Sequence, residues 1–173
     1  MVYGVGIRDL PFERGCKFYD RWRSMLRRAY CPKTLEKFPT YADVTVCTEW
    51  LKFSNFKKWM ETQDWQGKQL DKDLLVRGNK VYSPEACCFV TVEVNNFITL
   101  QDAKRGDLPL GCSYNSMARR YQATVKNTYI GLFDSPEEAH AAYLKEKIKI
   151  AGVLASKETD ARIAEALLRY FVL

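Results

Sequence analysis

Residues 119–126 of this chain, RRYQATVK, alternate between polar and apolar or aromatic side chains, and this period of two constrains the fold more than any other feature. In an extended strand, Tyr121, Ala123 and Val125 point to one side and the residues between them point to the other. An asparagine then separates this run from a second β-prone run, TYIGLF. The pattern predicts a β-hairpin over residues 119–133 with one apolar face that must be covered.

A helix that can cover this face is predicted directly after the hairpin. Ser135 is a good N-cap residue, Pro136 suits the first helical position, and Glu138 stands where a capping box has its glutamate. This helix is expected to run to about Ile150. A final helix is expected over residues 157–170, capped by the serine that precedes it. The fold class is therefore α+β.

The string G-x-F-D-S-P-E-E-A-x-x-A-Y, residues 131–143, resembles part of the DNA-binding domain of plant ethylene-response factors, and a related module occurs in phage and mobile-element nucleases. The resemblance covers about residues 109–152. It implies a small antiparallel three-stranded sheet that packs on a helix and enters the major groove of double-stranded DNA. The side chains implied for DNA contact are largely those of the polar hairpin face: Arg119, Arg120, Gln122, Thr124, Lys126 and Tyr129. An ordinary solvated sheet face is the alternative interpretation.

An amphipathic helix is predicted over residues 15–30, with apolar residues on one face and arginines mostly outside it. Most of the net charge of +6 falls in this first part of the chain. Such arginines form either a solvated helix face or a surface for DNA phosphates, which release counterions when they are neutralised. The predicted phosphate contacts are Arg21, Arg23, Arg27 and Arg28. A second helix, over residues 49–62, carries an aromatic stripe that is expected to pack in a core.

The run LDKDLLVRGNKVYSPEACCFVTVEVNN, residues 70–96, resembles a degenerate HNH nuclease core, which has a ββα-metal fold. In that family an acidic residue on the first strand and a His or Asn on the helix hold one divalent cation, and a histidine deprotonates water. By position, the resemblance implies Asp71 and Asn95 as metal ligands, with Asn96 as an adjacent option. It implies Asn79 as the residue that orients the base. Oxygen ligands favour Mg²⁺ or Mn²⁺ as the cofactor.

The chain departs from the HNH pattern at the general base, where Lys72 stands in place of histidine. A free lysine has a pKa of about 10.4, so it is mostly protonated at neutral pH and is a poor base. Lys72 would then bind phosphate, and Asp73 or the metal itself would activate water. The simpler interpretation of Asp71 and Asp73 is a pair of salt-bridged carboxylates near a turn. The CCFVTV run favours a strand, which two asparagines would end.

Several function classes are excluded or made less favourable by the composition. His140 is the only histidine, so one chain cannot build a multi-histidine metal site, and its place in the DNA-binding motif favours a packing role. Six cysteines without a C-x-x-C pair argue against a zinc ribbon. No apolar run is long enough to span a membrane and no signal-peptide pattern is present, so we expect no membrane partner and a cytoplasmic location. Residues 97–118 are interpreted as a linker, which predicts domains at 1–104 and 105–173.

These features predict a double-stranded DNA-binding protein that resembles phage HNH homing endonucleases, with metal-dependent DNA nicking only if the degenerate core is catalytic. Two alternatives stay open. One is a non-catalytic DNA-binding regulator that keeps the nuclease scaffold. The other is a viral protein that uses the same fold to bind and inhibit a host enzyme in the host cytoplasm. The sequence predicts neither the DNA target nor the oligomeric state.

Overall fold

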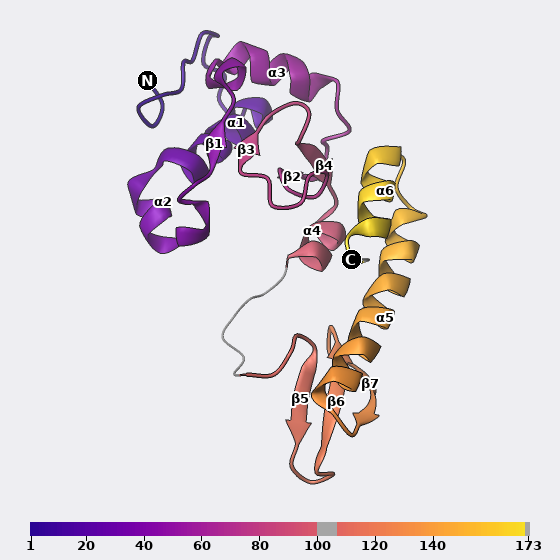
Figure 1. Ribbon diagram of the computed structural model, residues 1–173. Helices are drawn as coiled ribbons and strands as arrows, with labels where there is room; N and C mark the ends of the chain where they lie inside the picture. Colours follow the sequence, from indigo (N-terminus) through magenta and orange to yellow (C-terminus); the bar gives the residue numbers. More distant parts are fainter. Residues whose placement is uncertain (100–106, 172–173) are drawn as a thin grey trace. The chain divides into compact units, whose positions relative to one another are not determined.

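The computed structural model describes residues 1–99 and 107–171, and in these residues the chain is α+β (Figure 1). Its contacts divide the chain into two units, Met1–Asn96 and Phe97–Leu173. The predicted domain boundary between residues 104 and 105 lies outside the described residues. Each unit is considered by itself below.

The N-terminal unit combines helices with two small strand pairs. Strands β1 and β3 pair in parallel, and strands β2 and β4 pair antiparallel. The elements in chain order are α1 (Lys17–Tyr30), α2 (Pro32–Lys37), η1 (Pro39–Tyr41), β1 (Thr45–Val46), η2 (Thr48–Leu51), α3 (Phe53–Glu61), β2 (Gln69–Asp71), β3 (Val81–Tyr82), β4 (Cys88–Val90) and α4 (Val92–Ile98), which crosses the division between the units. The predicted N-terminal helix is thus confirmed as α1, while the helix predicted over residues 49–62 is split into η2 and α3.

Aromatic side chains from α1, η2 and α3 form the core of the N-terminal unit. Trp22, Trp50 and Phe56 are almost completely buried, and the indole Nε1 of Trp22 donates a hydrogen bond of 2.7 Å to the carbonyl of Trp50. Burial of a large apolar side chain contributes roughly 1.5–3 kcal/mol, and the indole N–H keeps a partner inside the core. The aromatic stripe predicted from the sequence therefore packs as expected.

The C-terminal unit contains an antiparallel sheet in the order β5–β6–β7. Its strands are β5 (Cys112–Asn115), β6 (Arg120–Val125) and β7 (Thr128–Phe133), followed by α5 (Pro136–Ala155) and α6 (Ala161–Arg169). Ala123 and Val125 are buried together with Ala139 of α5, so the three-stranded sheet packs on a helix as predicted. Lys126 and Asn127 have φ angles of 45° and 67°, which form the tight two-residue turn that suits the twist of a hairpin.

The interpretation of residues 97–118 as a linker is wrong at its C-terminal end, because Cys112–Asn115 form strand β5. It is also wrong at its N-terminal end. The ammonium of Lys147, on α5, donates a hydrogen bond of 2.8 Å to the carbonyl of Phe97 and lies 3.8 Å from the centre of the Phe97 ring. The hydroxyl of Tyr170 donates to the carbonyl of Ile98. These contacts hold the last two residues of α4, Phe97 and Ile98, to the C-terminal unit.

The N-terminus of α5 follows its capping signature closely. The hydroxyl of Ser135 accepts a hydrogen bond from the backbone N–H of Glu138, and the carboxylate of Glu138 accepts from the N–H of Asp134. The C-terminus differs from the prediction, since α5 continues to Ala155 rather than to about residue 150. The helix continues because its last turn buries Leu154. The next helix, α6, also differs from the prediction, because its N-cap is Asp160 rather than the predicted serine.

No helix within residues 1–99 and 107–171 has both the length and the apolar character needed to cross a membrane.

Gly111 allows β5 to start close to α5, so its replacement tests the packing of the C-terminal unit. Its φ is +76°, and a Cβ at this position would run into the ring of Tyr143. We expect Gly111→Ala to lower the free energy of unfolding by about 2–4 kcal/mol, from the strained φ together with the overlap. Gly78→Ala is the matched control, because Gly78 has a φ of +77° but open space around it. Urea unfolding followed by circular dichroism measures both, and equal losses would contradict this account.

Candidate functional site

The sheet of the C-terminal unit presents a polar face opposite the face that packs on α5. Ala123 and Val125 are buried, so the pleat places Arg120, Gln122 and Thr124 on the other side. The register adds side chains from both neighbouring strands, because residues directly opposite one another share a face. The polar sheet face consists of Ser113, Asn115, Arg120, Gln122, Thr124 and Tyr129, together with apolar Leu132 opposite Gln122.

Several of these side chains are held in place by neighbours in the same unit. The Asn115 amide donates a hydrogen bond of 3.3 Å to the side-chain oxygen of Gln122, and its own oxygen accepts from the N–H of Ala118 in the following turn. The Nε of Arg120 lies 2.8 Å from a carboxylate oxygen of Asp134, an ion pair whose N–H is not aligned for a hydrogen bond. Both Gln122 and Arg120 are therefore positioned while still partly exposed.

Two of the six residues predicted for DNA contact lie at the ends of β6 rather than on its face. Arg119 occupies the turn before β6 with a φ of 52°, and Lys126 occupies the hairpin turn. The ammonium of Lys126 lies 5.5 Å from the centre of the Phe97 ring. Ser113 and Asn115 were missed because their strand was interpreted as part of a linker. Strand β5 has four residues, which is too short to show a clear period of two in the sequence. The three-stranded sheet implied by the resemblance was the only signal for this strand.

The arginines of α1 differ in how far the fold buries them. Arg21 donates a hydrogen bond of 3.0 Å to the carbonyl of Lys68, and the guanidinium of Arg28 lies 5.5 Å from the centre of the Tyr82 ring. Both side chains are half-buried, whereas Arg23 and Arg27 are exposed. The predicted set of phosphate contacts is therefore divided into two residues that stabilise the fold and two that face solvent.

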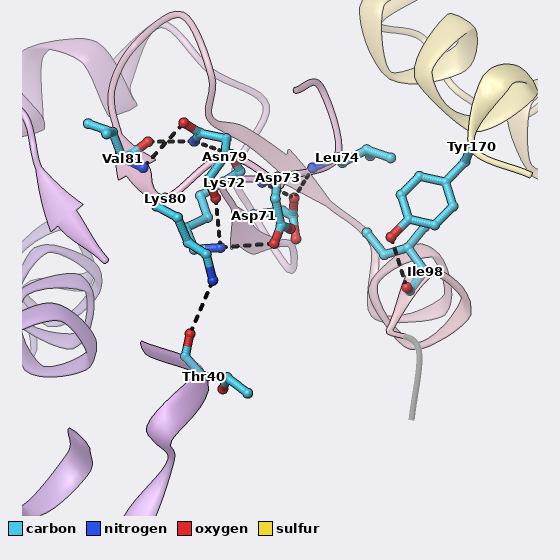
Figure 2. Close-up of polar contacts among 10 residues, drawn as sticks. All are labelled: Thr40, Asp71, Lys72, Asp73, Leu74, Asn79, Lys80, Val81, Ile98 and Tyr170. Atoms are coloured by element: carbon cyan, nitrogen blue, oxygen red, sulfur yellow. Dashed lines mark hydrogen bonds and ion pairs between the residues drawn. The ribbon is translucent and has the colours of Figure 1, made fainter. Parts of the chain in front are cut away.

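The end of strand β2 carries a compact polar cluster, shown in Figure 2. One carboxylate oxygen of Asp71 accepts the backbone N–H groups of Asp73 and Leu74, at 3.0 and 2.7 Å. These hydrogen bonds turn the chain immediately after the strand. The local reason is ordinary turn chemistry, since an aspartate is a frequent first residue of such turns.

Lys72 lies at the centre of this cluster, and its side chain is almost completely buried. Its ammonium donates to the Asp73 carboxylate at 2.9 Å and to the carbonyl of Asn79 at 3.2 Å. The amide of Asn79 in turn donates to the carbonyls of Lys72 and Val81, at 2.7 and 2.6 Å. Asn79 thus fixes the loop that contains Lys72. The HNH resemblance implied a different role for Asn79, which was to orient the catalytic base.

The structure brings together four of the five predicted nuclease residues, namely Asp71, Lys72, Asp73 and Asn79. The fifth, Asn95, lies on α4, which follows β4, and its backbone N–H donates to the carbonyl of Thr91. The expectation that the asparagines end a strand is therefore wrong, because both lie inside this helix. Strands β2 and β4, which β3 separates in the chain, nevertheless form an antiparallel pair that α4 follows.

Burial shapes the electrostatics of the cluster. Loss of hydration raises the pKa of the Asp71 carboxyl, and the neighbouring Asp73 carboxylate raises it further, against the two N–H groups that favour the charged form. Behind the cluster, burial raises the pKa of the Cys87 thiol to about 12. The charged form of Asp71 is thus kept in surroundings that disfavour it.

The side chains of this cluster do not fit a divalent cation in the arrangement observed. One oxygen of Asp71 already accepts two N–H groups, and one oxygen of Asp73 already accepts from the Lys72 ammonium. Across residues 1–99 and 107–171, no group of three or more His, Cys, Asp or Glu side chains could hold a metal ion. The Mg²⁺ or Mn²⁺ cofactor stays a prediction that depends on the resemblance.

The chain was compared with models of known protein families, with curated proteins and with solved structures, and none of them matches it. The resemblances to the ethylene-response-factor domain and to the HNH core therefore remain predictions.

We expect Asp71→Asn to raise the melting temperature at neutral pH. Because the pKa of Asp71 is raised in the fold, the folded state holds more protons than the unfolded state above the ordinary value of 3.8, and stability falls as pH rises through that window. Asparagine keeps the oxygen that accepts both N–H groups but removes the charge. A gain of ~1 kcal/mol would raise the melting temperature by about 2–4 °C.

The gain in melting temperature should shrink as the pH falls towards 3.8, because the raised pKa lets the folded wild-type carboxyl take up its proton above that value. Asp43→Asn removes an exposed carboxylate of the same unit and serves as the control, with no change expected. Differential scanning calorimetry across pH measures both variants. A lower melting temperature for Asp71→Asn at neutral pH would mean that the charge itself stabilises the turn.

Proposed function

We propose that this protein binds double-stranded DNA, with the polar sheet face in the major groove. The observation that carries the proposal is the alternation on β6, which buries Ala123 and Val125 and leaves Arg120, Gln122 and Thr124 in a row on the other side. The major groove is wide enough for β-strands, and side chains at every second position can reach successive base edges.

The chemistry of this row suits base edges. Arginine pairs with the two acceptors of guanine, glutamine pairs with the donor and acceptor of adenine, and threonine contacts either a polar edge or the thymine methyl group. The hydrogen bond from Asn115 holds the Gln122 amide and leaves its NH₂ group as a donor for the groove. Tyr129, which is 57% exposed beside Thr124, widens the surface on β7.

Arg120 must exchange partners when DNA binds. Its ion pair with Asp134 is exposed on both sides, with 43% and 82% of the side chains accessible. Exposed ion pairs contribute only about 0–1 kcal/mol, so a guanine or a phosphate can replace Asp134 with little loss. The pair keeps Arg120 over the sheet in the free protein.

Positive charge supports the same proposal. The chain carries a net charge of +6, and Arg23 and Arg27 of α1 are exposed. When the logarithm of the affinity for duplex DNA is plotted against the logarithm of the salt concentration, each phosphate that the protein neutralises makes the slope more negative by about 0.9. A DNA-binding protein of this charge should therefore lose affinity steeply with salt.

Two threonines of the same sheet provide a matched test. Thr124 lies on the polar sheet face, while Thr128 pairs with buried Val125 and lies on the opposite side. We expect Thr124→Ala and Gln122→Ala to lower affinity for duplex DNA by about 5- to 100-fold each, and Thr128→Ala to leave it unchanged. Fluorescence anisotropy with a pool of randomised duplexes, followed by the selected sequence, measures the effect.

Equal affinity of Gln122→Ala, Thr124→Ala and wild type would remove the polar sheet face from the proposal. A wild-type protein without measurable DNA affinity at low salt would favour the alternative in which the chain binds a host protein.

DNA nicking is a second candidate, favoured by one observation. Asp71 ends β2, which pairs antiparallel with β4, and Asn95 lies on α4, which follows β4 in the chain. The Lys72 ammonium beside Asp73 counts against it. A nicking assay on supercoiled plasmid with Mg²⁺ or Mn²⁺ compares wild type with Asp71→Ala. Nicking that needs both the metal and Asp71 would support a nuclease, and its absence would leave the DNA-binding proposal alone.

A further inference from the structure

The N-terminal unit contains a hollow that belongs to neither candidate site described above. It has a volume of about 430 Å³ and lies where the C-terminal end of α1 meets α2 and η1. Its lining combines four cationic side chains with two aromatic rings: Arg27, Arg28, Lys33, Lys37, Phe38 and Tyr41. The volume falls in the range of pockets that bind small molecules, which is about 300–1,000 Å³.

The charge of this hollow is not balanced from within the fold. None of its lining residues is acidic, and no ion pair in the part of the chain that the structure describes joins these four cations to a carboxylate. The ring of Tyr82 beneath the Arg28 guanidinium helps to keep this side chain at the wall. Four cations around one concave surface create a positive potential that favours an anion.

The lining also offers aromatic surface. Phe38 is 47% exposed, so its ring is accessible to a ligand in the hollow. The ammonium of Lys37 lies 5.4 Å from the centre of its ring, so charge and aromatic surface meet at the same edge of the hollow. Tyr41, on η1, adds a second, half-buried ring.

A ligand that contacts both the cations and the aromatic rings of this hollow must carry an anionic group next to a flat group that can stack. A nucleoside phosphate has this chemistry, because its phosphate pairs with Lys and Arg while its base stacks on an aromatic ring. We propose that this hollow, the α1–α2 pocket, binds a nucleoside phosphate, with Lys33 and Lys37 at the phosphate and Phe38 at the base. This inference stands without the polar sheet face, since the two lie in different units.

The nucleoside phosphate can come from a single strand of nucleic acid or from a free nucleotide. The experiment therefore uses two probes on the full chain: a fluorescein-labelled oligothymidylate of about 12 nucleotides, and AMP as a competitor and as a direct ligand in calorimetry. Binding of the oligothymidylate alone identifies a strand, and binding of AMP in the same pocket identifies a free nucleotide.

Phe38→Ala is the decisive variant, and Phe12→Ala is its matched control. Both phenylalanines are exposed, at 47% and 60%, and each has a cation about 5.5 Å from its ring centre, but only Phe38 lines the pocket. We expect Phe38→Ala to weaken binding of the probe by about 5- to 100-fold and Phe12→Ala to leave it unchanged. Both side chains lie at the surface, so both variants should fold.

The double variant Lys33→Ala/Lys37→Ala tests the phosphate side of the pocket. We expect weaker binding and a salt slope that is smaller by about 1.4, from two lost phosphate contacts on a single strand. Lys58→Ala/Lys145→Ala removes two exposed lysines elsewhere and should behave like wild type. Gln122→Ala should also leave oligothymidylate binding intact, which separates this inference from the proposed duplex binding.

Two results would overturn the inference. If Phe38→Ala binds both probes like wild type while the lysine variant does not, the surface attracts anions without recognising a base. If neither probe binds, or if both pocket variants match their controls, the pocket does not take a nucleoside phosphate.

Discussion

The burial of Ala123 and Val125 against α5 is the constraint on which the C-terminal unit depends. Because side chains alternate along a strand, covering one face of β6 leaves Arg120, Gln122 and Thr124 no other side to occupy. A slip of one residue would place these polar groups against the helix, so the packing also fixes the register. Gly111 belongs to the same constraint, since only a residue without a Cβ lets β5 begin beside Tyr143. The polar sheet face is thus a consequence of packing before it is a surface for DNA.

The cluster around Lys72 consists of polar groups that satisfy one another at the end of β2. An ammonium at hydrogen-bond distance from Asp73 satisfies a carboxylate that would otherwise be available to a cation. The side chain of Lys72 is 11% exposed and that of Asp73 is 45% exposed, so loss of Asp73 would leave a largely buried ammonium with the Asn79 carbonyl as its hydrogen-bond partner. Lys72, Asp73 and the Asn79 carbonyl therefore form a set in which each member supports the others.

Local signals in the sequence predicted the elements that local chemistry determines. The hairpin follows from alternation, and the start of α5 follows from Ser135 and Glu138, whose hydrogen bonds are present as expected. Non-local contacts decided what the sequence did not predict. Strand β5 exists because it pairs with β6, and α5 continues to Ala155 because α6 covers its last turns. The strand that CCFVTV favours is present as β4, with α4 starting at the last residue of that run. The chemistry of the candidate cluster was predicted as a set of residues, but the burial that raises the pKa of Asp71 depends on the tertiary fold.

A sheet that packs one face on a helix normally has a polar face on its other side, so the polar sheet face is not unfavourable for the stability of the fold. Its proposed role depends on charge and on the resemblance. The N-terminal unit differs, because one of its features is unfavourable for the fold. Asp71 keeps a carboxylate where burial and Asp73 disfavour its charge. Natural chains tend to break such local rules at functional sites and to compensate elsewhere. In the same unit, the α1–α2 pocket gathers four cations and has no acidic residue in its lining, so an anionic ligand would relieve their mutual repulsion.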